Sequence, residues 1–93
     1  MAQLLTDAEI QEQASGLSDW KIEGSQLQTS RTFKDFIAAI EFVNKLVKPA
    51  ESVGHHPDIE ISYNKVKISL TTHDAGGLTQ KDFDVAKLIS QID

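Results

Sequence analysis

The pattern of apolar and polar residues changes its period along the chain, and each change predicts a new element. Thr6 and Glu9 form a capping box, in which each side chain can bond the backbone amide of the other residue. This box predicts a short helix from about residue 7 to residue 14. Apolar and polar residues then alternate on both sides of Gly24-Ser25, as they do in half-buried strands, so residues 19–33 are predicted to form a β-hairpin.

The longest helix is predicted to begin at Asp35 and to run to about Val47, or as far as Val53. Its apolar residues cover more than half of the helix circumference and comprise Phe36, Ala39, Ile40, Phe42, Val43, Leu46, Val47 and Ala50. One face of a small sheet is too narrow for so wide an arc. Either the helix is enclosed within the core, or it also contacts another subunit. Pro49 has no backbone amide hydrogen, which predicts a kink or a restart there.

The second half of the chain repeats the hairpin and the capped helix. Residues 59–63 and 66–72 both alternate, and the short connection at Asn64-Lys65 predicts a tight hairpin turn between them. Thr79 and Asp82 form a variant of the capping box. The apolar residues that follow recur at helical spacing and predict a final amphipathic helix.

The predicted order is helix, two strands, helix, two strands, helix. Hairpins joined by helices favour an α+β fold, here a two-layer sandwich in which a four-stranded antiparallel sheet is backed by helices on one face. The 93 residues are predicted to form a single domain over 1–93. A chain of this length buries roughly 60–65% of its unfolded surface, so self-association would add to a modest core.

The composition excludes several classes of function. Nine Lys and Arg against fourteen Asp and Glu give a net charge of −5, whereas a nonspecific nucleic-acid binder needs a basic surface. The chain has no cysteine, which excludes disulfides and thiolate catalysis. No apolar run approaches the ~20 residues of a membrane span, and the N-terminus lacks the features of a signal peptide. We therefore expect a cytoplasmic protein that does not associate with membranes.

The residues with candidate chemistry lie close together in the sequence. They are Glu51, His55, His56, Pro57, Tyr63, His73 and Asp82, and they include all three histidines of the chain. Histidine has an ordinary pKa of about 6.5 and can therefore donate and accept protons near neutral pH. If the strand before His73 lies beside the strand after Pro57, the three rings meet at one end of the sheet. We interpret this group as a candidate active site.

Each of these residues also has a structural explanation. Glu51 lies four residues before His55 and shares its helix face if the helix continues, or is simply solvated. Asp82 belongs to a helix cap, or orients a histidine through its second ring N–H, and one carboxylate can do both. Tyr63 can be a core residue. Three histidines and an aspartate can also ligate zinc, although His55 and His56 would point in opposite directions in an extended backbone.

The spacing of these residues resembles the signature of the pterin-4a-carbinolamine dehydratases. The matching positions are Glu51-x-x-x-His55-His56-Pro57, Tyr63, His73 and Asp82. The likeness extends to Tyr63-Asn-Lys-Val and to Thr72–Thr79, and it spans about residues 4–92. Ile59 stands where a tryptophan is common in the family, and Gly54 stands where many relatives carry a larger polar side chain.

The resemblance implies an activity and a set of partners. The family removes water from 4a-hydroxy-tetrahydropterin to give quinonoid dihydropterin, in tetrahydrobiopterin recycling, with no cofactor and no metal. A pterin is thus the implied substrate, and an aromatic amino acid hydroxylase is the implied partner in the pathway. The fold implied is an α+β domain with a four-stranded antiparallel sheet. Members form dimers or dimers of dimers, so a homodimer or homotetramer is expected.

The same resemblance implies roles for individual residues. It implies that His55, His56 and His73 are catalytic, with His56 and His73 as the acid/base pair and His55 as a polariser of the 4a-hydroxyl. Asp82 and Glu51 would support these histidines. The remaining implied contacts with the pterin come from Pro57, Thr71 and Thr72.

Two other functions remain open at this point. Some family members act as dimerisation cofactors of a homeodomain transcription factor through the long helix. A transcriptional coactivator-like binding module is therefore the main alternative, and it requires an exposed apolar helix face. A pterin-binding protein without turnover is the third hypothesis. The presence of all three histidines argues against it.

Overall fold

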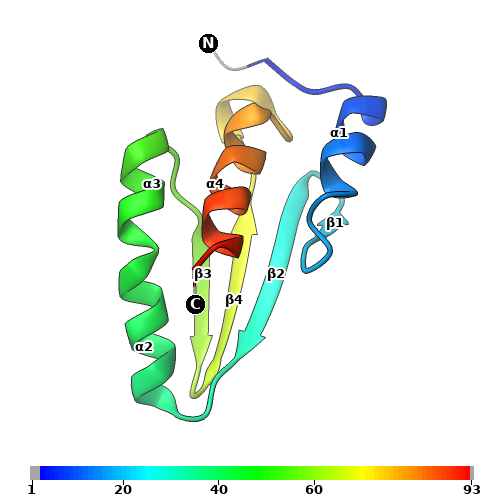
Figure 1. Cartoon of the computed structure of the whole chain (residues 1–93). Helices are drawn as coiled ribbons and strands as arrows, with labels where there is room; N and C mark the ends of the chain where they lie inside the picture. The colour runs from blue at the N-terminus through cyan, green and yellow to red at the C-terminus, as the bar shows by residue number, and fades with distance from the viewer. Residues whose placement is uncertain (1–2, 93) are drawn as a thin grey trace.

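The computed structural model describes residues 3–92. Its elements, shown in Figure 1, are α1 (Asp7–Ala14), β1 (Lys21–Glu23), β2 (Gln26–Thr32), α2 (Phe36–Lys45), α3 (Val47–Val53), β3 (Asp58–Ser62), β4 (Lys65–Leu70), the 3₁₀ turn η1 (His73–Ala75) and α4 (Gln80–Ser90). This is the predicted order, with the long helix divided into two and a 3₁₀ turn added before the last helix.

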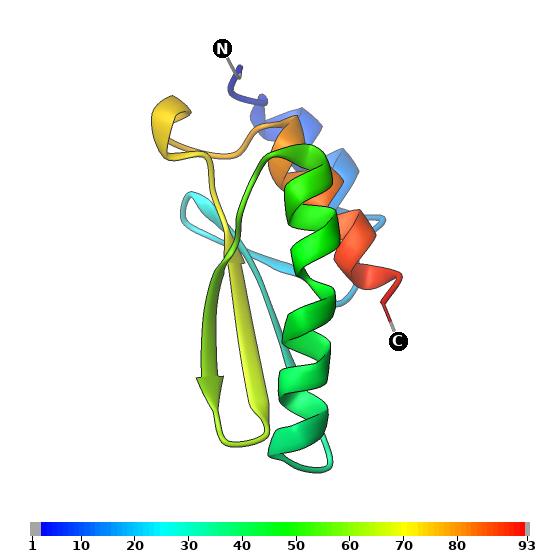
Figure 2. The same ribbon diagram turned by 90° about the vertical axis from the view of Figure 1, so that its left-hand side faces the viewer.

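The four strands form one antiparallel sheet in the order β1-β2-β4-β3. β2 and β4 are therefore central, and their pairing runs from Leu27 opposite Leu70 to Thr32 opposite Lys65. The two hairpins supply the outer pairings. Figure 2 shows the sheet on one side of the molecule and the helices on the other. The predicted two-layer α+β sandwich is confirmed.

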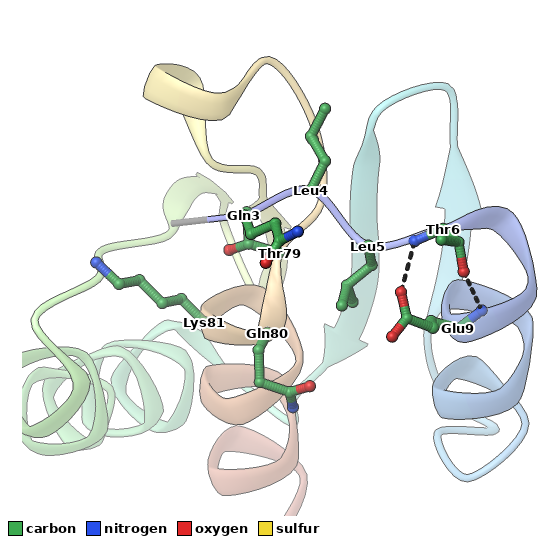
Figure 3. A pocket seen from close by; sticks show the side chains of 8 residues that line it. All are labelled: Gln3, Leu4, Leu5, Thr6, Glu9, Thr79, Gln80 and Lys81. Atoms are coloured by element: carbon green, nitrogen blue, oxygen red, sulfur yellow. Dashed lines mark hydrogen bonds between the residues drawn. The ribbon is translucent and has the colours of Figure 1, made fainter. Parts of the chain in front are cut away.

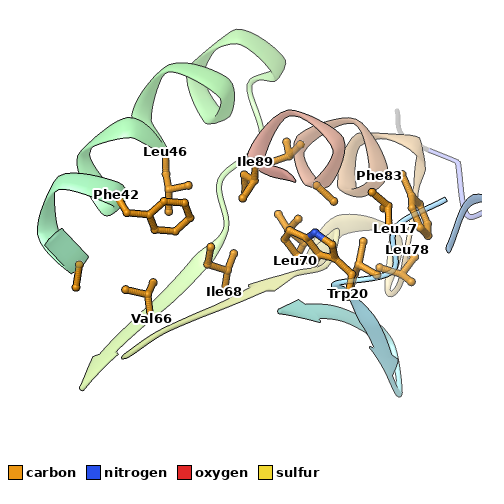
Figure 4. Close-up of a cluster of buried hydrophobic side chains, with 14 residues drawn as sticks. Leu17, Trp20, Phe42, Leu46, Val66, Ile68, Leu70, Leu78, Phe83 and Ile89 are labelled. Atoms are coloured by element: carbon orange, nitrogen blue, oxygen red, sulfur yellow. The ribbon is translucent and has the colours of Figure 1, made fainter. Parts of the chain in front are cut away.

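The core lies between the sheet and the helix layer. Val66, Ile68 and Leu70 alternate along β4 and are fully buried, because every second side chain of a strand points to the same face. The strand β2 adds Leu27. Helices and connecting segments supply the rest of the cluster in Figure 4, which includes Leu17, Trp20, Phe42, Leu46, Leu78, Phe83 and Ile89. The packing of α4 onto the sheet holds its first turn beside the end of β4.

The two predicted capping boxes are present at the predicted residues. The hydroxyl of Thr6 accepts from the amide of Glu9 at 3.1 Å, and the Glu9 carboxylate accepts from the amide of Thr6 at 2.8 Å. At the start of α4, the amide of Thr79 donates to the Asp82 carboxylate at 2.9 Å. Within residues 3–92, no helix combines the length and the apolar character that a bilayer crossing requires.

The predicted long helix is interrupted at Leu46, between α2 and α3. Pro49 cannot donate an amide hydrogen to the carbonyl of Lys45, four residues earlier, which accounts for a break one turn before the proline. The helix thus restarts as predicted, but at Val47 and not at Pro49 itself, which lies in the first turn of α3. In Figure 1 the two helices are stacked end to end along one side of the sheet.

The wide apolar arc of this helix pair is divided between the core and the surface. Ala39, Phe42, Leu46 and Ala50 are buried. Other apolar side chains remain exposed on the helices and on the edge strand β3, and we call them the outer apolar residues: Phe36 (50%), Ile37 (69%), Val47 (61%), Ile59 (37%) and Ile61 (41%). Enclosure within the core therefore explains only one part of the arc.

The turn of the second hairpin differs by one residue from the prediction. Ser62 pairs with Lys65, so the turn consists of Tyr63 and Asn64 and not of Asn64 and Lys65. Tyr63 has a φ of 52°, in the left-handed region that favours glycine. Asn64 bonds Phe33 twice: its side-chain amide donates to the Phe33 carbonyl at 2.7 Å, and its own carbonyl accepts from the Phe33 amide at 2.8 Å. This tertiary contact favours the observed turn position.

Candidate active site

The three histidines lie at one end of the molecule, where α3 ends, β4 runs into η1 and α4 begins (Figures 1 and 2). β3 and β4 are neighbours in the sheet, which was the condition for the rings to meet. His55, His56 and His73 line one hollow of about 290 Å³, which we call the histidine hollow. The structure thus brings together three side chains that span 19 positions of the sequence.

His55 is bonded to a carboxylate in the interior. Its Nε2 lies 2.5 Å from Oδ1 of Asp82, whose side chain is 0% exposed, while the His55 side chain is 14% exposed. The second oxygen of Asp82 accepts from the hydroxyl of Thr72 at 2.8 Å and from the amide of Thr79 at 2.9 Å. One carboxylate therefore both caps α4 and orients the ring of His55. The other ring nitrogen, Nδ1, is not used in this bond.

His56 is bonded to a carboxylate at the surface. Its Nε2 lies 2.5 Å from Oε2 of Glu51, and the two side chains are 64% and 67% exposed. Glu51 was predicted to share a helix face with His55 if the helix continued, or else to be solvated. The helix α3 ends at Val53, and the Glu51 side chain is exposed. Gly54 then adopts a φ of 71°, which reverses the chain and places His56 over the last turn of the helix.

His73 is the first residue of η1 and is exposed. The loop that carries it is closed by the backbone of Thr72, whose carbonyl accepts from the amides of Ala75 and Gly76 and whose amide donates to Gly77. Gly76 permits this closure through a φ of 79°. Within residues 3–92 the ion pairs are those of His55 and His56, so His73 is the histidine without a carboxylate partner.

Thr71 and Thr72 both line the histidine hollow, but their groups are used differently. Thr72 is buried, and its hydroxyl and both backbone groups bond within the loop and to Asp82. The hydroxyl of Thr71 donates to the carbonyl of Ser25 at 2.7 Å, which ties the end of β4 to the first hairpin. A ligand in this hollow would therefore meet Thr71 more readily than Thr72.

Pro57 and Tyr63, unlike the rest of the predicted group, neither line the histidine hollow nor bond a histidine that lines it. Pro57 lines a separate apolar groove of about 280 Å³, which also borders His56 and lies between α2, α3 and β3. Tyr63 is at the tip of the β3–β4 hairpin, at the opposite end of the molecule, and is 66% exposed (Figure 2). Tyr63 is thus neither a core residue nor part of the site.

The sequence analysis missed two charged residues that line the histidine hollow, Asp74 and Lys81. Each directly adjoins a residue that was singled out, but adjacency alone does not predict orientation. Among residues 3–92, no group of three or more His, Asp or Glu side chains is arranged to hold a metal ion. His55 bonds Asp82 on α4, whereas His56 bonds Glu51 on α3. Chemically, the hollow presents three imidazoles that can donate and accept protons.

Comparison with known proteins gives one consistent family. The family model described as pterin 4 alpha carbinolamine dehydratase matches residues 3–92. A protein of Trichormus variabilis is 82% identical over 92 residues, and one of Acidobacterium capsulatum is 50% identical over 92 residues. Each alignment covers 99% of both chains, and both proteins are provisionally named pterin-4-alpha-carbinolamine dehydratases.

Solved structures share the fold. The crystal structure of a transcriptional coactivator/pterin dehydratase from Brucella melitensis matches with a TM-score of 0.85 and 33% identity, covering 92% of this chain and 94% of the other. A pterin dehydratase-like protein, identified as a RuBisCO assembly factor in the alpha-carboxysome, matches with a TM-score of 0.59 and 20% identity over 75% and 81% of the two chains. The second likeness concerns the fold alone.

Proposed function

The chain belongs to the pterin 4 alpha carbinolamine dehydratase family, and from this premise we propose that it removes water from a 4a-hydroxy-tetrahydropterin to give the quinonoid dihydropterin. The observation that carries the proposal is the meeting of His55, His56 and His73 in one hollow of a chain that matches the family over almost its whole length. The reaction would recycle tetrahydrobiopterin in the cytoplasm after an aromatic amino acid hydroxylase has used it.

The reaction requires two proton transfers and no change of oxidation state overall. The C4a–O bond breaks as the hydroxyl leaves as water, which is easier when an acid protonates it. The hydrogen on N5 is lost to a base, and the nitrogen lone pair forms the new N5–C4a double bond. Positioned imidazoles typically accelerate such transfers by about 10²–10⁴-fold.

We assign the acid/base steps to His56 and His73, and the polarisation of the 4a-hydroxyl to His55. The assignment is supported by exposure: His56 and His73 are open to a ligand, whereas His55 is largely buried and held by Asp82. Glu51 would orient His56 in the way that Asp82 orients His55.

Contacts with the flat pterin ring are proposed for Pro57, Thr71 and Thr72. Thr71 is the strongest of these, because its side chain is half-buried and open to the hollow whereas Thr72 is buried. Pro57 would act from the groove side of His56 and not from the histidine hollow itself.

The test is the ultraviolet time course of 4a-hydroxy-tetrahydropterin decay near neutral pH, with and without the protein. We expect clear acceleration over the spontaneous reaction, and a loss of about 100-fold in kcat/KM for His56→Ala and for His73→Ala. Both side chains are exposed, so the urea midpoint of each variant should match the wild type and exclude misfolding as the cause. Unchanged rates in both variants would remove these residues from the mechanism.

We also propose that copies of the chain associate through the outer apolar residues, giving a homodimer or homotetramer. Support comes from their exposure on α2, α3 and the edge strand β3, where several large apolar side chains face water. The native mass should then be an even multiple of 10.3 kDa. Val47→Glu should shift the mass downward, because it places a charge among these residues. A monomeric wild type would contradict the association.

The same exposed residues favour a second candidate function, a coactivator-like binding module. The Brucella relative is described both as a transcriptional coactivator and as a pterin dehydratase. The two functions separate experimentally. His73→Ala should lower kcat/KM by about 100-fold and leave any partner binding intact, whereas Val47→Glu should weaken partner binding. Full turnover in a monomeric Val47→Glu variant would show that catalysis does not need the apolar surface.

A further inference from the structure

A second hollow adjoins the histidine hollow at the start of α4. It has a volume of about 340 Å³ and is lined by Gln3, Leu4, Leu5, Thr6, Glu9, Thr79, Gln80 and Lys81, drawn in Figure 3. The segment before α1 runs along it and bridges to the start of α4 at Leu4 and Thr79. Its walls are mixed, with amide and hydroxyl groups beside two leucines.

A buried hydrogen bond joins the walls of the two hollows. Thr72 lines the histidine hollow and Thr79 lines the second one, and their hydroxyls lie 2.8 Å apart in a buried hydrogen bond. Lys81 is the residue that lines both hollows. It therefore lies where a ligand in the histidine hollow would extend past the threonine pair.

The backbone of Lys81 is positioned next to a residue that bonds a histidine. It directly precedes Asp82, whose buried carboxylate bonds His55. The side chain itself is exposed. Within residues 3–92 the ion pairs belong to His55 and His56, so the Lys81 ammonium has no carboxylate partner there. In Figure 3 it points away from Glu9, whose carboxylate is bonded to Thr6.

The sizes of the hollows suggest how a substrate is divided between them. Small-molecule sites typically measure about 300–1,000 Å³. The histidine hollow, at about 290 Å³, is at the lower limit of that range and suits a bicyclic ring better than a ring with a long substituent. A substituent would continue into the second hollow. Lys81 is the single lysine or arginine among the residues that line the two.

We propose that Lys81 is a specificity-determining residue, whose ammonium donates hydrogen bonds to oxygen atoms on the C6 substituent of the pterin. This inference rests on the proposed dehydratase function and adds to it a preference for substrates with hydroxyl or anionic oxygens on that substituent. Because the ammonium would bond the C6 substituent and neither the 4a-hydroxyl nor N5, it should affect binding of the substrate and not the chemical step.

The test compares two 4a-hydroxy substrates, tetrahydrobiopterin with its dihydroxypropyl substituent and 6-methyl-tetrahydropterin, which lacks oxygen there. Lys81→Met keeps the length of the side chain and removes the charge. We expect it to raise KM for the biopterin substrate about three- to tenfold, with kcat within twofold, and to leave the 6-methyl substrate unaffected. Lys81→Arg should keep the preference. Lys87→Met is the matched control, because Lys87 lies on the same helix and lines neither hollow.

The outcomes separate the two proposals. Acceleration of both substrates by the wild type, with an equal or absent response to Lys81→Met, would overturn the role of Lys81 alone. A loss of selectivity in Lys87→Met as large as that in Lys81→Met would also overturn it, since the effect would then be one of general charge. Acceleration of neither substrate would overturn the dehydratase proposal and this inference with it.

Discussion

The site contains two histidine–carboxylate pairs that have the same N···O distance and very different surroundings. His55 and Asp82 are 14% and 0% exposed, whereas His56 and Glu51 are 64% and 67% exposed, and both pairs measure 2.5 Å. Asp82 also accepts bonds from Thr72 and Thr79. Glu51 projects from the last turn of α3 into solvent. The His55–Asp82 pair is thus buried within the fold, whereas the His56–Glu51 pair lies on the surface.

The difference shows how unevenly the two pairs contribute to the stability of the fold. A buried carboxylate is stable only when its oxygens are bonded, so Asp82, Thr72 and the start of α4 depend on one another. An exposed pair is screened by water and contributes little to folding. The proton transfers that we propose for His56 would therefore leave the fold undisturbed.

The largest effect should follow from Asp82→Ala. It removes the bonds to His55, to the Thr72 hydroxyl and to the Thr79 amide, and we expect the free energy of unfolding to fall by about 2–4 kcal/mol. Urea denaturation measures it. Asp84→Ala is the control on the same helix, because the Asp84 side chain bonds only Gln80 at the surface and its loss should cost less than about 0.5 kcal/mol. Equal losses in the two variants would show that the buried bonds of Asp82 stabilise the fold no more than those of a surface carboxylate.

A smaller effect is expected for Thr72→Val, which keeps the shape of the side chain and removes the hydroxyl. Asp82 loses one donor and keeps the Thr79 amide, so the free energy of unfolding should fall by about 1–2 kcal/mol. Thr71→Val is the matched control, since that hydroxyl bonds a carbonyl at the surface. A Thr72→Val variant as stable as the wild type would show that the buried network does not stabilise the fold.

The smallest effect on stability is expected for Glu51→Gln. The pair with His56 is exposed, so the free energy of unfolding should change by less than about 0.5 kcal/mol, and 1 M salt should reduce that difference further. The same variant should lower kcat/KM several-fold if Glu51 orients His56. Urea denaturation and the pterin assay measure the two quantities on one preparation. A loss of more than about 1 kcal/mol in the free energy of unfolding would show that Glu51, like Asp82, stabilises the fold.

Much of the fold was predictable because its signals are local. Both capping boxes, the two hairpins and the interruption by Pro49 depend on residues a few positions apart, and each is present. The prediction that failed at the hairpin turn did so through a distant residue. Asn64 bonds Phe33, 31 positions earlier, and this contact shifts the turn onto Tyr63 in spite of its positive φ.

The three histidines of the site were predictable from the sequence, whereas their carboxylate partners and the other lining residues were not. Histidines are few in this chain and their spacing is distinctive, so the sequence by itself determined the family, the architecture and the group of three rings. Only the tertiary structure decided which carboxylate serves which histidine, that Tyr63 lies at the far end, and that Lys81 borders two hollows. The physical reason is that the chain reverses at Gly54 and that α4 packs on the sheet, and both place residues 27 positions apart in contact.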